Sequence, residues 1–205
     1  MLDALAITAA STVLAFAVAA VLGLLLAVGR RSSIRLVSWP FAAVIEFVRS
    51  TPLLVQLIFL YYALPDLGIV LTPLQTLVLG LGVHYGCYCS EAYRAGINSV
   101  PEGQWEAATA LNLGPRTTWT QVILPQAIPN VLPALGNFLV AAFKDAPLGS
   151  AVQITGVLAF ATAINGSTFR PVEPFLLIGV GFLIVSLPAA WLVRRLENRV
   201  GYERT

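Results

Sequence analysis

Few residues of this chain have side chains suited to catalysis or metal binding, and they stand inside an apolar segment. One histidine, His84, lies close to two cysteines, Cys87 and Cys89. Residues two apart on a helix point to different faces, so these cysteines are poor co-ligands and we expect them to pack in the core. With a single histidine and no other ligand pattern, the sequence predicts neither a metal site nor a catalytic centre. The chain is therefore not expected to be an enzyme.

Six charged residues interrupt the apolar segments. They form three close sets: Glu46 with Arg49, Glu91 with Arg94, and Lys144 with Asp145. A charge inside a membrane span costs roughly 2.5–3.5 kcal/mol on insertion scales, so each needs a partner or a cavity. The members of the first two sets are three residues apart and can meet on one helix face. We interpret these two sets as structural ion pairs rather than as substrate ligands.

The third set, Lys144-Asp145, could border a path for a solute. Pro147 and Gly149 follow it and should interrupt the helix. Non-helical backbone within a membrane normally lines a cavity, and a zwitterionic solute would need one cation and one anion along its way. A pair bound to neighbouring spans fits the same pattern equally well.

Two tyrosines are further candidates for this path. Tyr85 and Tyr88 are three residues apart on one expected span, and aromatic faces attract cations. Tyr61 and Tyr62 are better explained as aromatic residues of the membrane–water interface.

The composition shows what kind of protein must position these residues. Of the 205 residues, 58% are apolar and 11% are charged, and the mean hydropathy is +0.82. A water-soluble domain of this size could not bury so much apolar surface, and disordered chains are poor in apolar residues. The net charge of +2 does not indicate a nucleic-acid partner. The chain is expected to be one membrane-embedded domain, 1–205.

Five apolar segments are long enough to cross a bilayer as helices, which needs about 20 residues. They run from Ala4 to Val28, Leu36 to Leu64, Leu74 to Ile97, Ile128 to Leu148 and Pro174 to Val193. The sequence thus predicts an all-α polytopic membrane protein with five transmembrane helices.

The basic residues predict its orientation, because cytoplasmic loops are rich in arginine and lysine. Nine of the twelve follow spans one, three and five: Arg30, Arg31, Arg35, Arg94, Arg116, Arg194, Arg195, Arg199 and Arg204. The amino terminus should therefore lie outside and the carboxyl terminus in the cytoplasm.

This orientation makes residues 98–125 a long cytoplasmic loop, called here the 98–125 loop. Ser99 and Glu102 have the spacing of a capping box and predict a helix through Leu111. Asn112 and Gly114 can both take left-handed backbone angles and should end it. Pro115 should begin a second helix, which Pro125 should close before the fourth span.

The 98–125 loop could serve either of two purposes. The small side chains of Ala107 and Ala108 would let another protein pack closely, with Trp105 and Leu111 as anchors. Alternatively, the loop is a re-entrant connector that folds against its own spans. Residue chemistry alone rates the two interpretations about equally.

The loop resembles the EAA motif of bacterial ABC importer permeases, which reads EAA, three residues, glycine, nine residues and Ile-x-Leu-Pro. Glu106-Ala107-Ala108 and Leu124-Pro125 match it at the right spacing. Asn112 occupies the position of the motif's glycine, and Val122 that of its isoleucine. Asparagine can also take left-handed backbone angles, and valine is likewise apolar and β-branched. The resemblance implies a MetI-like permease fold and a role in ATPase coupling for this part of the chain. The residues concerned are Gln104, Glu106, Ala107, Ala108, Asn112, Gly114 and Pro125.

Other segments resemble the polar amino-acid family of these permeases, over about residues 5 to 198. They are Phe47 to Leu57, Glu91 to Ile97, Gly103-Gln104, Leu124 to Gln126 and Lys144-Asp145. Leu60 to Pro65, His84-Tyr85, Gln104 to Leu113 and Ala127 to Pro129 are similar to the ectoine/hydroxyectoine permease subunit of the D type. Ala146 departs from that subunit, which usually has threonine there.

The resemblance implies a transport subunit of the bacterial inner membrane that carries ectoine or hydroxyectoine inward. A polar amino acid such as glutamine, glutamate or arginine is the alternative solute. The chain has no G-x-x-x-x-G-K-[ST] motif, so it should hold no cofactor, and ATP and Mg²⁺ would be bound by a separate ATPase. The implied partners are a second permease subunit in a heterodimer, two ATPase subunits, an extracytoplasmic solute-binding protein and membrane lipid.

A transporter that acts alone is a different class of protein and is disfavoured. Secondary transporters commonly contain internal repeats, and none is evident here, while the 98–125 loop suits a docking partner.

Overall fold

The computed structural model describes residues 2–202, with side chains described through residue 195. The described residues form helices and connecting turns with no strand, so the all-α prediction is confirmed. The helices are α1 (Leu2–Arg30), α2 (Arg35–Arg49), α3 (Leu53–Ile58), α4 (Pro73–Asn98), α5 (Glu102–Ala110), α6 (Pro115–Thr117), α7 (Leu124–Asp145), α8 (Val157–Thr168) and α9 (Val172–Tyr202). Of the basic residues used to predict orientation, Arg204 and the side chain of Arg199 lie outside this description.

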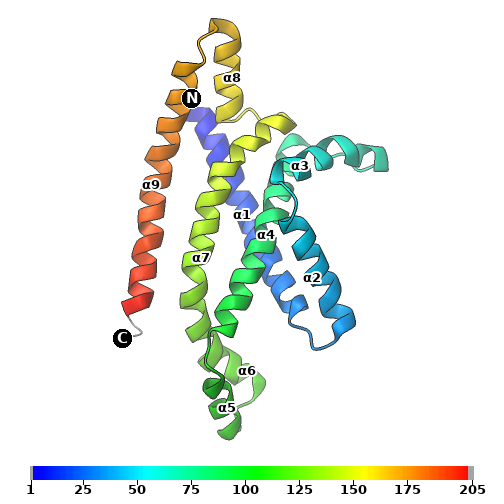
Figure 1. The fold of residues 1–205 in the computed structure, drawn as a ribbon, viewed down its shortest axis with the longest axis vertical. Coiled ribbons are helices and arrows are strands. Elements are labelled where there is room, and N and C mark those ends of the chain that lie inside the picture. The colour runs from blue at the N-terminus through cyan, green and yellow to red at the C-terminus, as the bar shows by residue number, and fades with distance from the viewer. Residues whose placement is uncertain (1, 203–205) are drawn as a thin grey trace.

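Four long helices, α1, α4, α7 and α9, run lengthwise through the molecule (Figure 1). The α5 and α6 helices lie at one end, and α8 lies at the other (Figure 1). Figure 1 also shows that α1 begins near α8, whereas α9 runs toward the end that carries α5 and α6. The two ends of the described chain therefore lie at opposite ends of the molecule.

Close packing of α1 against α4 forms the centre of the structure. Ala15 and Ala19 of α1 are buried against α4, and both cysteines are fully buried and free. A Cβ atom on Gly23 would lie only 2.6 Å from the Cβ of Cys89, so only glycine allows this approach. The cysteines thus occupy packing positions.

The predicted second span, Leu36 to Leu64, is not one straight helix, and this expectation is wrong. The chain bends by 103° between α2 and α3. Pro52 disfavours helical angles at Thr51 and lacks a donor of its own. The hydroxyl of Thr51 donates to the carbonyls of Phe47 and Val48, both at 3.1 Å, which satisfies the end of α2. After α3, the chain continues through a π-helical turn, Phe59–Ala63, and a 3₁₀ turn, Leu64–Leu67.

By length and apolar composition, three helical stretches of the described chain could each cross a membrane. They are Leu2–Arg30, Pro115–Val152 and Val172–Arg195, and the bent pair would make a fourth. The α4 helix has 26 residues, which is long enough, but it carries many polar side chains. The predicted count of five thus stays a prediction.

The end of α7 changes its winding at the predicted position. The α-helix ends at Asp145, and Ala146–Val152 continue as a 3₁₀ helix with Pro147 in its first turn. Gln153 then takes a left-handed conformation with φ of 66°. The short helix α8 follows, and it lies outside the five predicted spans.

Candidate functional site

The 98–125 loop forms a helix, a turn and a second helical stretch, as expected. Helix α5 ends at Ala110, and Asn112 has φ of 53°, a left-handed conformation that asparagine tolerates better than most residues. The amide of Leu113 donates to the carbonyl of Ala108 at 3.0 Å and closes the helix end. Gly114 has φ of −65°, so the expectation of a second left-handed residue there is wrong.

The predicted capping box is not formed. Ser99 lies at the end of α4, where its hydroxyl donates to the carbonyl of Gly96 at 2.8 Å and accepts from Asn130 at 2.6 Å. Pro101 is the residue that precedes α5, and no side chain caps this helix. Because α4 extends to Asn98, Ser99 completes α4 instead of starting α5.

Pro125 does not close the second helix, contrary to the prediction. The chain runs from α6 through a π-helical turn, Thr118–Ile123, directly into α7, with Pro125 in its first turn. Proline is tolerated there because the wider winding before it changes the hydrogen-bond spacing. The stretch Pro115–Val152 is therefore one 38-residue helical rod. This rod connects the loop rigidly to the membrane-spanning part.

The two faces of α5 differ in what they expose. Gln104, Glu106 and Ala107 are exposed, whereas Ala108 is only 3% exposed. The prediction that Ala107 and Ala108 share one open surface is therefore wrong for Ala108. Leu111, just beyond the helix, is 74% exposed and available to a partner.

Three side-chain contacts hold the loop against the rest of the chain. The ring of Trp105 meets that of Trp119 edge-on at 5.3 Å between centroids, so Trp105 is engaged within the loop. Gln126 of α7 donates to the side-chain oxygen of Gln104 at 3.2 Å. The guanidinium of Arg31 lies 5.7 Å from the centre of the Trp119 ring. The loop is thus anchored to α7 and to Arg31, just after α1, and is exposed on one side.

A second group of polar residues lies around α4, between α3 and the end of α7. This group, called here the α4 cluster, consists of Gln56, His84, Tyr85, Tyr88 and Asp145. The hydroxyl of Tyr85 donates to Asp145 Oδ2 at 2.7 Å, and His84 Nδ1 lies 3.2 Å from Gln56 Oε1. The ring of Tyr88 lies 5.2 Å from that of His84. Three of the four predicted path residues therefore come together.

Lys144 is the predicted path residue that does not join the α4 cluster. Its side chain is exposed, and it makes no ion pair with a described residue. Neighbouring residues on a helix point about 100° apart, so Asp145 faces α4 while Lys144 faces away. Lys144 and Asp145 could bind one solute together only if the end of α7 were arranged differently or a second subunit completed the site.

Sequence reasoning missed His84 and Gln56 as cluster members. His84 was considered as a metal ligand, although a polar side chain within an apolar span in itself indicates a functional site. Gln56 also donates to the carbonyl of Val48 at 2.7 Å. It therefore connects the end of α2 to His84 of α4. That second contact depends on the 103° bend, which the sequence did not indicate.

The two predicted ion pairs have different outcomes. Arg94 Nη2 lies 2.6 Å from Glu91 Oε2, and Glu91 also pairs with Arg30 of α1. Glu46 and Arg49 do not pair, and Glu46 is exposed. The guanidinium of Arg49 instead lies 5.2 Å from the centre of the Tyr88 ring, because α2 itself packs against α4.

Neither region has the geometry of an active site or metal centre. The described residues hold no group of three histidine, cysteine or acidic side chains that could bind a metal ion. The α4 cluster combines an amide, an imidazole, two phenols and a carboxylate within an apolar surrounding. Such groups can bind a polar solute through hydrogen bonds and cation–π contacts.

Comparison with known proteins gives consistent matches along most of the chain. Residues 19–202 match the family model described as "Binding-protein-dependent transport system inner membrane component". A probable amino-acid ABC transporter permease protein, y4tG of Sinorhizobium fredii, is 48% identical over 194 residues, covering 95% of this chain and 84% of that protein. The L-cystine transport system permease protein TcyB of Bacillus subtilis is 32% identical, covering 92% and 83%.

A solved structure shares the arrangement of the helices. The crystal structure of an amino acid ABC transporter with histidines has a TM-score of 0.91 and 33% sequence identity, covering 97% of this chain and 92% of that chain. The predicted MetI-like fold is thereby confirmed.

Proposed function

Because this chain belongs to the family of inner membrane components of binding-protein-dependent transport systems, we propose that it is the permease subunit of an ATP-driven importer for an amino acid. The observation that carries the choice of solute is the 48% identity to a probable amino-acid permease across 95% of the chain. The chain is itself a transport subunit and not an enzyme.

The proposed transport cycle uses the exposed face of the 98–125 loop as the ATPase docking site. Glu106 and Ala107 are exposed there, and Leu111 adds an apolar side chain. The ATPase subunits would bind ATP and Mg²⁺, and their closure would move α5. The continuous rod from Pro115 to Val152 would carry this movement toward the α4 cluster. ATP binding drives the change only if the ATPase prefers one of the two permease states.

The proposed assembly contains a second permease subunit in a heterodimer, two ATPase subunits and an extracytoplasmic binding protein. The basic residues Arg116, within α6, and Arg31, which contacts Asn98 and Trp119, lie at the 98–125 loop, in accord with a cytoplasmic location for that end. The amino terminus would then lie outside and the carboxyl terminus in the cytoplasm of a bacterial cell, with the chain in the inner membrane.

The proposed solute path passes the α4 cluster. Tyr88 presents an aromatic face beside Arg49, and Asp145 supplies a carboxylate held by Tyr85. An amino acid carries an ammonium and a carboxylate, which suit Asp145 and Arg49 respectively. Exposed Lys144 would contribute only where the second permease closes the path.

Ectoine remains the second candidate solute, because segments such as Gln104 to Leu113 resemble the ectoine permease subunit. The names of the relatives reported above refer to amino acids, which favours the amino-acid proposal. Both solutes are zwitterionic, so the charge pattern of the α4 cluster fits either.

Uptake by the complete importer tests the proposal. The chain would be produced with its partner subunits in cells lacking other uptake routes, and labelled glutamine, glutamate, arginine, cystine and ectoine would be supplied separately. We expect ATP-dependent uptake of one amino acid and little uptake of ectoine. Uptake of ectoine alone would favour the second candidate, and uptake without an ATPase would contradict both.

A further inference from the structure

Three arginines surround the turn between α1 and α2, and they differ in their partners. Arg30 pairs with Glu91 of α4, and Arg31 donates to Asn98 Oδ1 at 2.9 Å. Arg35, the first residue of α2, is exposed and takes part in none of the ion pairs formed by the described residues. Its charge is therefore available to a ligand from outside the chain.

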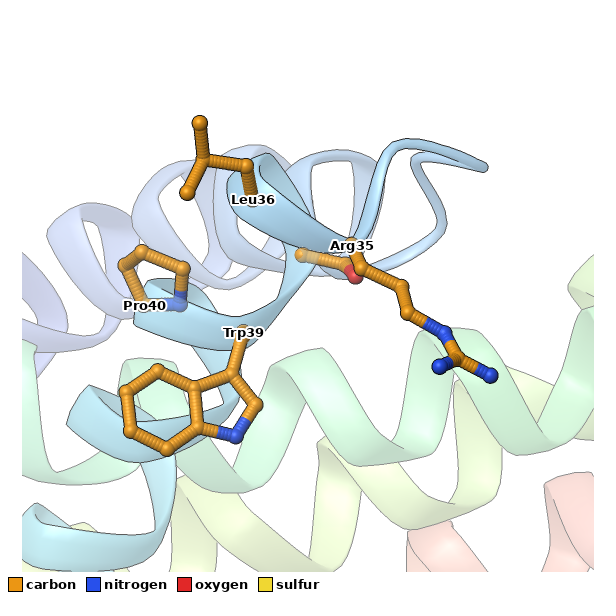
Figure 2. A pocket seen from close by; sticks show the side chains of 5 residues that line it. Arg35, Leu36, Trp39 and Pro40 are labelled. Atoms are coloured by element: carbon orange, nitrogen blue, oxygen red, sulfur yellow. The ribbon is translucent and has the colours of Figure 1, made fainter.

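Arg35 lines an open pocket of about 520 Å³ on the first two turns of α2 (Figure 2). The lining residues are Arg35, Leu36, Ser38, Trp39 and Pro40. Leu36 is 87% exposed and Trp39 is 75% exposed, so both leave large apolar side chains uncovered by the protein. Figure 2 shows the guanidinium of Arg35 extending clear of the helix.

We infer that this pocket binds an anionic phospholipid of the surrounding bilayer. The guanidinium of Arg35 would hold the phosphate, since its planar donors match phosphate oxygens in pairs. Trp39 would lie at the level of the headgroup, where tryptophan is favoured in membrane proteins. Leu36 and Pro40 would contact the glycerol backbone and the upper acyl chain.

Charge and apolar surface together favour a lipid over other occupants. Arg31, four residues before Arg35, donates to the neutral Asn98 and takes part in none of the ion pairs of the described residues, so it adds to the positive potential of this turn. A free phosphate would satisfy the guanidinium but would leave Leu36 and Trp39 in water. A zwitterionic lipid would cover the apolar side chains but would carry no net charge to match the arginines.

Site-specific lipid crosslinking tests this assignment. The full chain is reconstituted in vesicles of equal amounts of phosphatidylglycerol and phosphatidylcholine, with one of the two made photoactivatable near its glycerol backbone. Crosslinks to residues 32–49 are then mapped by mass spectrometry. We expect about fivefold more crosslinking by phosphatidylglycerol than by phosphatidylcholine. Excess soluble glycerol phosphate should not lower it.

Two variants and one control separate the parts of the pocket. Arg35→Gln should reduce the ratio of the two lipids to about one, whereas Trp39→Ala should lower crosslinking by both lipids alike. Arg170→Gln removes the same charge from an exposed residue outside the pocket and should leave the ratio unchanged.

Several results would overturn the inference. They are an equal ratio in the unmodified chain, an unchanged ratio in Arg35→Gln, unchanged crosslinking in Trp39→Ala, or competition by glycerol phosphate. Protection of residues 32–49 from both lipids in the assembled importer would show that a protein subunit occupies the pocket instead.

Discussion

Glu106 of α5 is exposed and makes no ion pair with a described residue, whereas Asp145 at the end of α7 accepts a hydrogen bond of 2.7 Å from the buried Tyr85. Both are acidic side chains in the segments that the sequence marked as functional. Water solvates the Glu106 carboxylate, so its charge needs no partner within the chain. Asp145 lies in apolar surroundings, where a carboxylate without a partner costs far more free energy. The 98–125 loop can therefore tolerate unpaired charges that the α4 cluster cannot.

The largest effect is expected from Glu106→Lys or Ala107→Arg in the loop. A reversed charge or a large side chain at the proposed ATPase contact should lower uptake more than tenfold. Insertion into the membrane should be unchanged, because neither side chain is buried. Uptake and ATPase co-purification are measured together.

Glu173→Lys is the matched control, since it reverses the charge of an exposed residue at the start of α9. It should leave ATPase co-purification intact. Normal uptake in Glu106→Lys would mean that the loop is not the docking site.

A smaller effect is expected from Tyr85→Phe in the α4 cluster. Loss of the hydroxyl leaves the half-buried Asp145 without this donor, and an unsatisfied polar group shielded from water costs about 1–3 kcal/mol of the free energy of unfolding. The thermal unfolding midpoint should fall, and uptake should fall with it.

Tyr62→Phe removes a comparable hydroxyl, which donates to the carbonyl of Ala151 at 3.2 Å from an exposed side chain. Its midpoint should change less than that of Tyr85→Phe. Equal shifts in the two variants would show that Asp145 does not depend on Tyr85.

Lys144→Met should act on transport and leave folding nearly unchanged. Its exposed ammonium has no ion-pair partner among the described residues, so its removal should not lower stability. If it borders the path at the second permease, uptake should fall severalfold while assembly and ATP hydrolysis persist. Failure to assemble with the second permease would instead assign Lys144 to the subunit interface.

The smallest effect is expected at Asn112, the left-handed residue of the loop. Asn112→Gly should be tolerated, because glycine adopts φ of 53° freely. Asn112→Val should lose roughly 1–2 kcal/mol, because a β-branched side chain is strained there. Unfolding of the two variants in denaturant gives the comparison, and equal stabilities would contradict a left-handed requirement.

Local sequence rules were sufficient where the physical cause was local. The apolar run from Ala4 to Val28 predicted α1, and Asn112 predicted the turn after α5, since both follow from the properties of neighbouring residues. The change of winding at Pro147 followed from the missing amide of proline. The EAA spacing from Glu106 to Pro125 likewise identified the loop, although the exposure of each residue did not follow from it.

Contacts between distant segments were decided only by the tertiary structure. Arg49 was predicted to pair with Glu46 three residues away, but the packing of α2 against α4 brings the Tyr88 ring within 5.2 Å of its guanidinium. Ser99 was predicted to begin α5, but the extent of α4 makes it the end of the preceding helix.

The amino-acid sequence by itself therefore determined that the chain is helical, belongs in a membrane and carries the EAA spacing in a helix–turn–helix loop, because composition, periodicity and turn residues act locally. Which polar groups meet around α4 was decided by the packing of α3 and α7 on this helix. Apolar surroundings require each buried polar group to find a partner, and the helix positions determine which partner is within reach.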